Sequence, residues 1–425
     1  LDILVQQGFL QTNGGSHQWL KGPNFTQMFA FTPETKKGAS NFFWHESCQW
    51  DLDGDGKKDI ITTCANNTVT PVAKKIEWYR HSGNGQFTKY TICDSLGGVF
   101  IKLYDIDGDQ DMDIVVSQFF GPPAKPSIVW LEQLAKPSAS NSWLGQWAYH
   151  KIDHTTGLGY HMEFFDINGD GNVELVYGNH NNLNNTSIVD GNGNAIQSGL
   201  YYFDIPANPA ASTQWTKHLI AENFPCDLFD FGNPASQGSP GIWSHGDIDN
   251  NGFIDIVMPG DGKSGLYLVR QKPDHSFVTE KIAGGKMWGM AKIMDYDNNG
   301  VNEIVASLHN FPNNLFDALL GMPAGKLMIY KPANITPTGM IGVSEFDVFS
   351  IYPNPSTGIF SVNTFKNEGN INLSVVDIMG KTIYCESFNQ GTESISIDIS
   401  SHPAGTYFIK ITDGKNTKTE RLVKF

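Results

Sequence analysis

Oxygen-bearing side chains recur in this sequence at a fixed spacing that suits a hard metal ion. One nine-residue pattern is found five times, as DLDGDGKKD, DIDGDQDMD, DINGDGNVE, DIDNNGFID and DYDNNGVNE. Every copy places Asp, Asn or Glu at positions 1, 3, 5 and 9. Carboxylates this close together repel one another unless a cation lies among them, and Ca²⁺ takes about six to eight oxygen ligands. The spacing therefore predicts about five structural calcium ions, one in each loop.

The predicted ligands are the side chains at these positions, completed by the backbone carbonyl at position 7 and a water molecule. In chain order they are Asp51, Asp53, Asp55 and Asp59; Asp105, Asp107, Asp109 and Asp113; Asp166, Asn168, Asp170 and Glu174; Asp247, Asp249, Asn251 and Asp255; and Asp295, Asp297, Asn299 and Glu303. Glycines at or just after position 4 permit a sharp turn. Asparagine at a ligand position removes a charge, so we expect the third, fourth and fifth sites to be weaker.

Two other interpretations of the loops fit less well. An EF-hand or a dockerin-like loop shares the DxDxDG opening, but an EF-hand needs a bidentate Glu at position 12, where the first loop has Thr62. It also needs flanking helices, whereas β-branched segments flank these loops. Turns that are acidic only for solubility would not repeat one ligand spacing in five places. Metal binding is the better interpretation.

The segments around each loop predict the strands that position it. An apolar stretch enters each loop, an apolar residue follows position 9 at once, and further alternating segments complete most units. Tandem four-stranded units predict an all-β fold, a β-propeller with five motif-bearing blades. The fifth unit lacks a fourth strand, and we expect TQMFAF (residues 26–31) to supply it and close the last blade. The total rises to six or seven blades if residues 1–25 contribute strands of their own.

Composition and charge agree with such a fold and exclude some partners. The 425 residues are 40% hydrophobic and 17% charged and include 44 Gly and 21 Pro, which suits short strands and tight turns. A net charge of −15 argues against nucleic acid or an anionic membrane as a partner. No apolar run approaches the roughly 20 residues needed to span a bilayer. The start at Leu1 indicates a mature form without its signal peptide.

The five cysteines have no metal-type spacing, and their odd number leaves at least one free. Cys48 and Cys64 lie on either side of the first acidic loop. A cross-strand disulfide between them and a pair of buried thiols are the two alternatives.

The five loops resemble the calcium-binding FG-GAP and VCBS repeats of integrin-type propellers and of many secreted bacterial proteins. The resemblance covers roughly residues 26–332 and implies a calcium-binding β-propeller over residues 1–332. In such repeats calcium is structural and joins two strands of one blade.

After a linker at residues 333–343, a second domain is predicted at residues 344–425. YPNPSTG, VVDIMGK, PAGTYFIKI and the final strand that contains Lys424 have the period-2 alternation of a small antiparallel sandwich. They closely resemble the type A C-terminal sorting domain of the type IX secretion system. The resemblance implies an immunoglobulin-like β-sandwich, the type IX machinery as a partner, and a secreted or outer-surface location. An ordinary immunoglobulin-like accessory domain is the alternative.

Polar and aromatic residues near the strand ends are expected to meet at one face of the propeller, around its central channel. The candidate ligand-binding residues are His45, Glu46, Tyr160, Asn179, His180, Trp243, Asp261, His309 and Asn310. Trp, Tyr and Asn suit stacking on sugars and hydrogen bonding to hydroxyls. The favoured function is therefore the binding of a glycan or a surface protein, in adhesion.

A catalytic alternative uses residues expected to point into the channel. Lys102, Glu163 and His161 could act as acid and base in a polysaccharide lyase or sugar dehydratase, because burial and neighbouring charges move pKa values toward neutrality. In the non-catalytic interpretation, Lys102, Glu163 and Lys292 pair with one another across a wet channel. The sequence contains no nucleophile elbow, HExxH or phosphate-binding glycine loop, so it indicates no particular reaction.

Overall fold

The computed structural model consists of β-strands and two short 3₁₀ turns. It describes residues 2–7, 15–120, 126–181, 198–224, 238–260, 265–283, 287–309, 326–331, 349–352, 354, 356–364, 370–377, 380–389, 392, 394–412 and 417–425. The chain forms two compact units, Leu1–Ile341 and Gly342–Phe425. The predicted linker at 333–343 lies outside the described residues. Among those residues, no helix is long and apolar enough to span a membrane.

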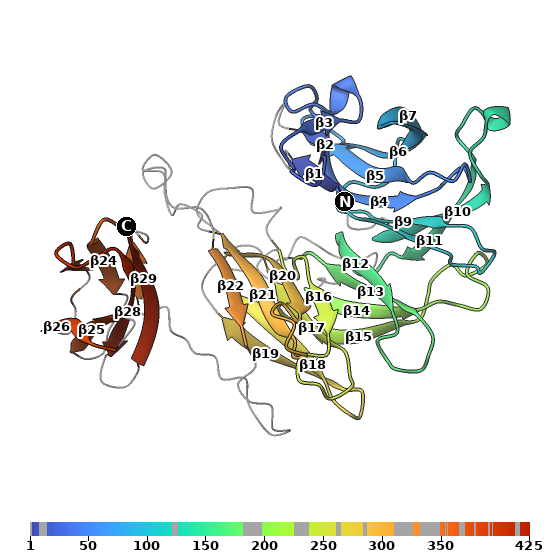
Figure 1. The fold of residues 1–425 in the computed structure, drawn as a ribbon. Coiled ribbons are helices and arrows are strands. Elements are labelled where there is room, and N and C mark those ends of the chain that lie inside the picture. Colours follow the sequence, from blue (N-terminus) through green and yellow to red (C-terminus); the bar gives the residue numbers. More distant parts are fainter. Residues whose placement is uncertain are drawn as a thin grey trace. The chain divides into compact units, whose positions relative to one another are not determined.

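The first unit contains six antiparallel sheets, in each of which the strand order follows the chain (Figure 1). The N-terminal sheet consists of β1 (Ile3–Gln7), β2 (Ser16–Leu20) and β3 (Met28–Ala30). Five further sheets are called blades 1 to 5. Blade 1 consists of β4 (Phe43–Trp50), β5 (Asp59–Asn66), β6 (Ala73–Gly83) and β7 (Gln86–Cys93), and blade 2 of β8 (Ile101–Tyr104), β9 (Asp113–Ser117), β10 (Ile128–Ala135) and β11 (Gln146–Asp153). Blade 3 consists of β12 (Gly159–Phe165), β13 (Glu174–Asn179), β14 (Gly199–Asp204) and β15 (Lys217–Glu222), blade 4 of β16 (Ser244–Gly246), β17 (Asp255–Pro259), β18 (Leu266–Gln271) and β19 (Phe277–Ala283), and blade 5 of β20 (Met287–Met294), β21 (Glu303–His309) and β22 (Lys326–Tyr330).

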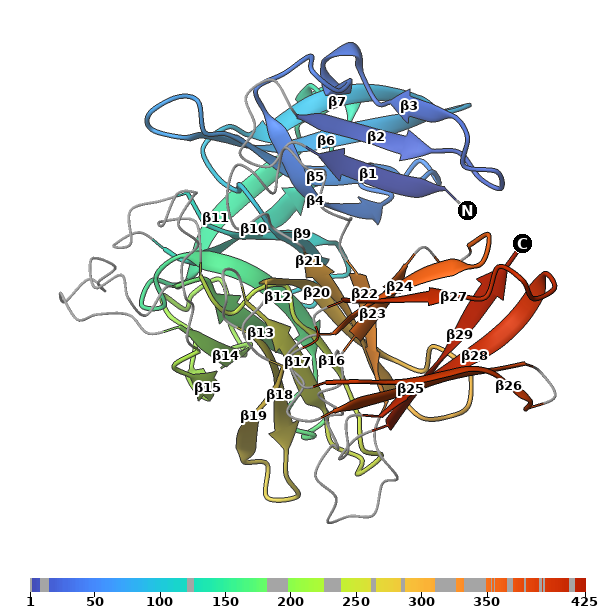
Figure 2. The ribbon, with the colours of Figure 1, turned by 90° about the vertical axis from the view of Figure 1, so that its left-hand side faces the viewer.

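The second strands of blades 1 to 4 are buried on both faces. All residues of β9, β13 and β17 are buried, and in β5 only the last residue is partly exposed. Continuous burial explains why these strands are nearly continuous apolar runs and do not alternate. Successive first strands contact one another, β4 with β8, β8 with β12 and β16 with β20, which is the inner arrangement of a β-propeller (Figure 2).

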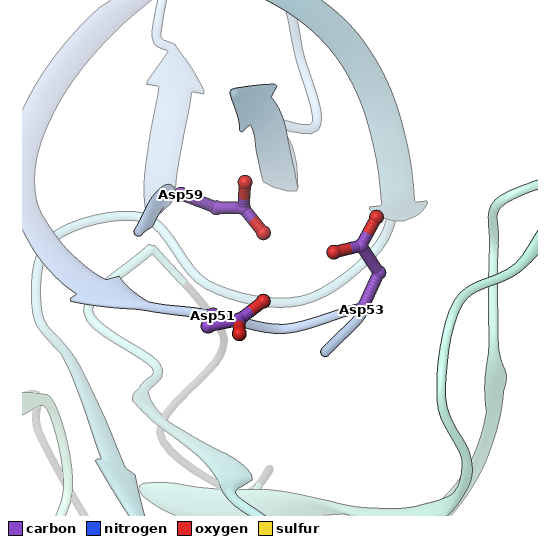
Figure 3. Close-up of side chains that lie close together, drawn as sticks. All are labelled: Asp51, Asp53 and Asp59. Atoms are coloured by element: carbon purple, nitrogen blue, oxygen red, sulfur yellow. The ribbon is translucent and has the colours of Figure 1, made fainter. Parts of the chain in front are cut away.

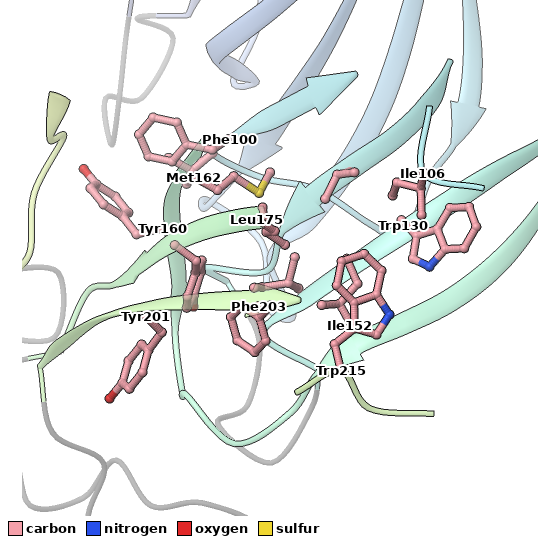
Figure 4. Packing of buried hydrophobic residues seen from close by; sticks show 14 of the residues in the cluster. Phe100, Ile106, Trp130, Ile152, Tyr160, Met162, Leu175, Tyr201, Phe203 and Trp215 are labelled. Atoms are coloured by element: carbon pink, nitrogen blue, oxygen red, sulfur yellow. The ribbon is translucent and has the colours of Figure 1, made fainter. Parts of the chain in front are cut away.

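Aromatic and aliphatic side chains fill the space between neighbouring blades. Between blades 2 and 3, Trp130 and Ile152 of one blade share a cluster with Leu175 and Phe203 of the next (Figure 4). Trp215, in the connection between β14 and β15, belongs to the same cluster. Burying each such side chain contributes about 1.5 to 3 kcal/mol. The packed interfaces between blades therefore hold the acidic loops in place.

The prediction that residues 26–31 complete the last blade is wrong, because the strand that forms in this segment, β3, does not pair with the last blade. β3 pairs with β2, with Trp19 opposite Phe29, and so belongs to the N-terminal sheet. Residues 3–7 and 16–20 form a hairpin that gives β3 a local partner. Phe31, just after β3, packs on Tyr79 and Phe87 of blade 1. Residues 1–25 thus contribute strands of their own, which is the case in which a sixth sheet was expected.

The second unit is a sandwich of two antiparallel sheets. One has the order β23 (Phe349–Tyr352), β24 (Ile359–Thr364), β27 (Ser394–Asp398); the other has the order β26 (Thr382–Phe388), β25 (Ile371–Asp377), β28 (Gly405–Thr412), β29 (Thr417–Lys424). Alternate residues of β25, β27 and β28 are buried, as the period-2 pattern requires. Both sheets contribute to one core, which includes Phe360 and Ile409.

The cysteines of the first hairpin do not form a disulfide. The register places Cys48 opposite Ile61 and Cys64 opposite Trp44, so the two thiols are not cross-strand partners. Cys48, Cys64, Cys93 and Cys385 are free, and Cys226 lies outside the described residues. Both cysteines of the pair are thiols, as in the second alternative, but only Cys64 is fully buried and Cys48 is partly buried.

Candidate metal centres

Each acidic loop joins the first and second strands of its blade and makes its turn at position 4. Loops 1 to 5 are residues 51–59, 105–113, 166–174, 247–255 and 295–303. At position 4, φ is +75° for Gly54 and +55° and +57° for Asn250 and Asn298. These values lie in the left-handed region, which Gly adopts freely and Asn tolerates better than most residues. The Gly-to-Asn exchange in loops 4 and 5 therefore preserves the turn.

The carboxylate at position 1 organises the turn from inside. In loop 1, the backbone N–H groups of Asp55 and Gly56 donate to Asp51 at 2.9 and 2.8 Å. In loop 3, Gly169 and Gly171 donate to Asp166 at 2.6 and 2.9 Å. The charge is thus held at the centre of the loop, and each carboxylate oxygen keeps a lone pair for a cation.

The carboxylate at position 9 is a buried clamp between the loop and the third strand. Asp255 accepts hydrogen bonds from the backbone N–H groups of Ile248, at 3.1 Å, and Gln271, at 2.9 Å. Asp113 is bound in the same way by Ile106 and Gln133. Burial, which these hydrogen bonds only partly offset, raises the pKa of Asp113 and of Asp255 to about 7. A carboxylate held in this way belongs to the framework of its loop as well as to its ligand set.

Three acidic side chains converge in every loop. Their oxygens lie within 4.8 Å of one another in the sets Asp51, Asp53 and Asp59; Asp105, Asp107 and Asp109; Asp166, Asp170 and Glu174; Asp247, Asp249 and Asp255; and Asp295, Asp297 and Glu303. Figure 3 shows the first set, with three carboxylates turned toward one space. Positions 1, 3 and 9 meet in loops 1, 4 and 5, whereas position 5 joins the sets only in loops 2 and 3.

The donor chemistry of these sets fits calcium. Every predicted side-chain ligand offers oxygen, the donor type that Ca²⁺ selects. In three loops a basic side chain of the third strand binds the position-3 carboxylate. Arg80 reaches Asp53 and also Asp55 at 2.9 Å, Arg270 Nη1 lies 2.6 Å from Asp249, and Lys331 binds Asp297. The carboxylates thus already attract positive charge. The sequence pattern of the loops did not reveal these cations, because the strand register brings them there.

The three candidate catalytic residues do meet, but each is already paired. Lys102 Nζ on β8 lies 2.7 Å from Glu46 Oε1 on β4 and 3.1 Å from Glu163 Oε1 on β12. His161 Nε2 lies 3.3 Å from the same Glu163 oxygen. Lys292, expected in this group, is exposed and makes no ion pair within the part of the chain that the structure describes.

The electrostatics of this group fix its charges. Burial opposes the charge on Lys102, but Glu46 and Glu163 outweigh it and raise the lysine pKa to about 12. Burial likewise opposes the charge on Glu163, but the hydrogen bond from His161 and the charge of Lys102 lower its pKa to about 2. Burial lowers the pKa of His161. Lys102 and Glu163 therefore stay charged across the neutral range and hold each other.

Four candidate ligand-binding residues lie in the interior, so the expectation that they line an open mouth is corrected. Tyr160, Asn179, His180 and Trp243 are all at most 7% exposed. Tyr160 stacks on His180 with 4.1 Å between ring centroids, and Trp243 packs against His161. These residues fill the interfaces between blades.

β-Bulges lie at two of the candidate positions, Tyr160 and His45. The register of the first strand shifts between Gly159 and Met162 in blade 3, and between Trp44 and Glu46 in blade 1. A bulge adds a residue and re-aims the side chains that follow, so a position near a strand start does not by itself place a side chain at an open mouth. His45 is half-buried against Phe100, and Glu46 binds Lys102. Asp261, Asn310 and the side chain of His309 lie outside the described residues.

One cavity lies between loops 2 and 3. It has a volume of about 490 Å³, and its lining includes the carboxylates of Asp105, Asp107, Asp170, Glu174 and Asp204. Tyr104 and Asn172 also line it, and the lining contains no Lys or Arg. The cavity therefore presents concentrated negative charge at the junction of two blades.

The first unit is thus a β-propeller with acidic loops inside its blades, and the second unit is a β-sandwich. Residues 51–116, which span loops 1 and 2, match the FG-GAP-like repeat, and residues 350–424 match the secretion system C-terminal sorting domain. The chain is therefore a propeller-type protein that the type IX secretion system exports to the cell surface or the extracellular space. No curated protein matches the chain.

Among solved structures, the chain is similar to three proteins at low identity. The Dos1 propeller is 11% identical, with a TM-score of 0.33 and coverage of 89% of this chain and 81% of that one. The biofilm matrix protein Bap1 of V. cholerae is 11% identical, with a TM-score of 0.37 and coverage of 89% and 65%. An exo-β-1,3-galactanase from Phanerochaete chrysosporium, solved with galactose, is 10% identical, with a TM-score of 0.29 and coverage of 89% and 94%.

Proposed function

We propose that this exported propeller is a calcium-stabilised binding protein that holds a glycan or a protein ligand outside the cell. The observation that carries the calcium part is the convergence of three acidic side chains within 4.8 Å in each of five loops. Calcium at these places would be held by the acidic side chains at positions 1, 3 and 9 in loops 1, 4 and 5, at positions 1, 3 and 5 in loop 2, and at positions 1, 5 and 9 in loop 3. It would offset their mutual repulsion and join the first strand of a blade to the second.

Thermal unfolding of the full-length protein tests the calcium part. An ion that binds only the folded state adds RT ln(1 + [L]/Kd) to the free energy of unfolding, about 2.7 kcal/mol for each site at a concentration one hundred times Kd. We expect a higher melting temperature in calcium than in excess chelator, and a smaller effect of magnesium. Equal melting temperatures in calcium and in chelator would refute calcium-dependent stability.

The paired charges of the inner strands favour binding over catalysis. A general acid or base works best with a pKa near the operating pH, whereas Lys102 and Glu163 have pKa values of about 12 and about 2. The two side chains also form an ion pair with each other. A lyase or a dehydratase that relied on these residues would have to break this group before each turnover.

A glycan array separates the two classes of function. The calcium-loaded protein is applied to immobilised glycans, and the bound glycans are then incubated with it and analysed by mass spectrometry. We expect the protein to bind glycans and to leave them unchanged. If it binds no glycan, the expected ligand is a surface protein. The appearance of unsaturated or dehydrated products would replace this proposal with the lyase or dehydratase alternative.

A further inference from the structure

One position on the third strand of each blade differs in charge between the five loops. The register places Tyr79, Leu131, Phe203, Val269 and Tyr330 opposite the apolar residue that follows position 9. The next residue along the third strand is Arg80, Glu132, Asp204, Arg270 and Lys331 in blades 1 to 5. Blades 1, 4 and 5 therefore have a cation where blades 2 and 3 have a carboxylate.

The cations of blades 1, 4 and 5 bind the loops that calcium would enter. Arg80 contacts Asp53 and Asp55, Arg270 contacts Asp249, and Lys331 contacts Asp297 and lies 3.7 Å from Glu303. A calcium ion in these loops must share the position-3 carboxylate with a guanidinium or an ammonium group, or displace it. The repulsion between two cations at this range lowers the affinity of the loop for the ion.

The acids of blades 2 and 3 act in the opposite direction. Glu132 adds a negative charge near loop 2, because the preceding residue, Leu131, pairs with Ile114 directly after the loop. Asp204 lines the cavity beside Asp170 and Glu174 of loop 3. Within the described residues, no Lys or Arg makes an ion pair with either loop.

Histidines of the fourth strands hold these two acids in place. His150 Nε2 lies 2.6 Å from Glu132 Oε2, and His218 Nε2 lies 2.9 Å from Asp204 Oδ2. Trp130 and Tyr202 pair with these two histidines across the strands and stack on them. At the equivalent position, blade 1 has Tyr90 and blade 4 has Glu280, which accompanies Arg270. The fourth strand thus complements the charge of the third.

The structure assigns two classes of calcium site, an inference that rests on the proposed calcium binding. Loops 2 and 3, which face each other across the acidic cavity, are the high-affinity pair; in loop 3 the added carboxylate of Asp204 supplies the charge that Asn168 lacks. Loops 1, 4 and 5 are low-affinity sites whose carboxylates are neutralised by side chains of the protein itself. The other three loops keep their geometry when calcium is scarce, because the protein's own cations neutralise their carboxylates.

Calcium titration of the chelator-stripped full-length protein by isothermal titration calorimetry tests the assignment. We expect two sites that bind at least about tenfold more tightly than the rest, since one added or removed charge at this range changes the binding constant of an ion by at least about this factor. Asp109→Ala, which removes the position-5 carboxylate that belongs to the acidic set of loop 2, should abolish one tight site. Asp274→Asn removes a carboxylate from the exposed turn between β18 and β19 and should leave both tight sites intact.

A gain-of-site variant gives the sharper test. Arg270→Gln frees Asp249 from its guanidinium and should increase the tight sites from two to three; Arg80→Gln provides the same test in loop 1 if the first variant does not fold. Five equivalent sites, or two tight sites that neither Asp109→Ala nor the Arg variants change, would overturn this assignment alone. The absence of any calcium binding would overturn the proposed function as well.

Discussion

Replacement of Lys102 by Met should destabilise the propeller and change its dependence on pH. The Lys102 ammonium holds Glu46 and Glu163 at 2.7 and 3.1 Å, and the three side chains are only 17%, 22% and 30% exposed. Breaking a buried ion pair by removing one partner costs about 3 to 5 kcal/mol. Since these groups keep some contact with solvent, we expect a loss of about 2 to 3 kcal/mol at pH 7.

The sign of the pH dependence follows from Glu163. Its folded-state pKa, about 2, lies below its ordinary value of 4.5, so its charge contributes stability that is present above pH 4.5 and is lost as the pH falls toward 2. Without Lys102 this pKa rises, and Glu46 and Glu163 repel each other until they are protonated. The difference in stability between wild type and Lys102→Met should therefore shrink between pH 7 and pH 3.

Urea denaturation at several pH values, with calcium held constant, measures this difference. Lys292→Met is the matched control, because Lys292 also lies on a first strand but is exposed. It should cost less than about 0.5 kcal/mol. A Lys102→Met effect as small as that of the control, or one that does not change with pH, would refute the account of the inner cluster.

Three further substitutions test other parts of the structure. Asp255→Ala removes two buried backbone hydrogen bonds and should cost about 2 to 4 kcal/mol that saturating calcium does not restore, as read from melting temperatures. Trp243→Ala should cost about 3 to 5 kcal/mol through the cavity it leaves between blades, and if ligand affinity falls without this loss of stability, Trp243 faces the ligand after all. Ile409→Ala in the sandwich core should cost about 2 to 5 kcal/mol and make residues 342–425 sensitive to protease, while the melting of the propeller stays unchanged.

The spacing of the acidic residues predicted the parts of the fold that depend on local chemistry. Asp51 and Asp59 occupy the beginning and the end of a strand-joining loop, as their positions in the repeat required. The apolar residues after position 9 lie in central, buried strands. The alternation in PAGTYFIKI gave a strand with alternate buried residues. Each of these features is set within about ten residues of chain, and the sequence is sufficient there.

Features that depend on pairing between distant segments could not be predicted in the same way. Met28–Ala30 could pair with either of two partners, and the adjacent hairpin supplied the one that formed. Tyr160 and Trp243 were placed at an open mouth because they lie near strand starts, but a β-bulge encloses Tyr160, and Trp243 packs in the core between blades 3 and 4. Arg270 reaches Asp249 only through the register between β17 and β18. That contact could have been anticipated by aligning the third strands of the repeats and not only their loops.

The most direct test of calcium in the acidic loops is anomalous diffraction from crystals of the full-length protein grown in calcium, recorded at a wavelength where calcium scatters anomalously. The account predicts strong anomalous peaks among the carboxylates of loops 2 and 3, with weaker peaks or none in loops 1, 4 and 5. Crystals that show no peak in any of the five loops at saturating calcium would contradict it.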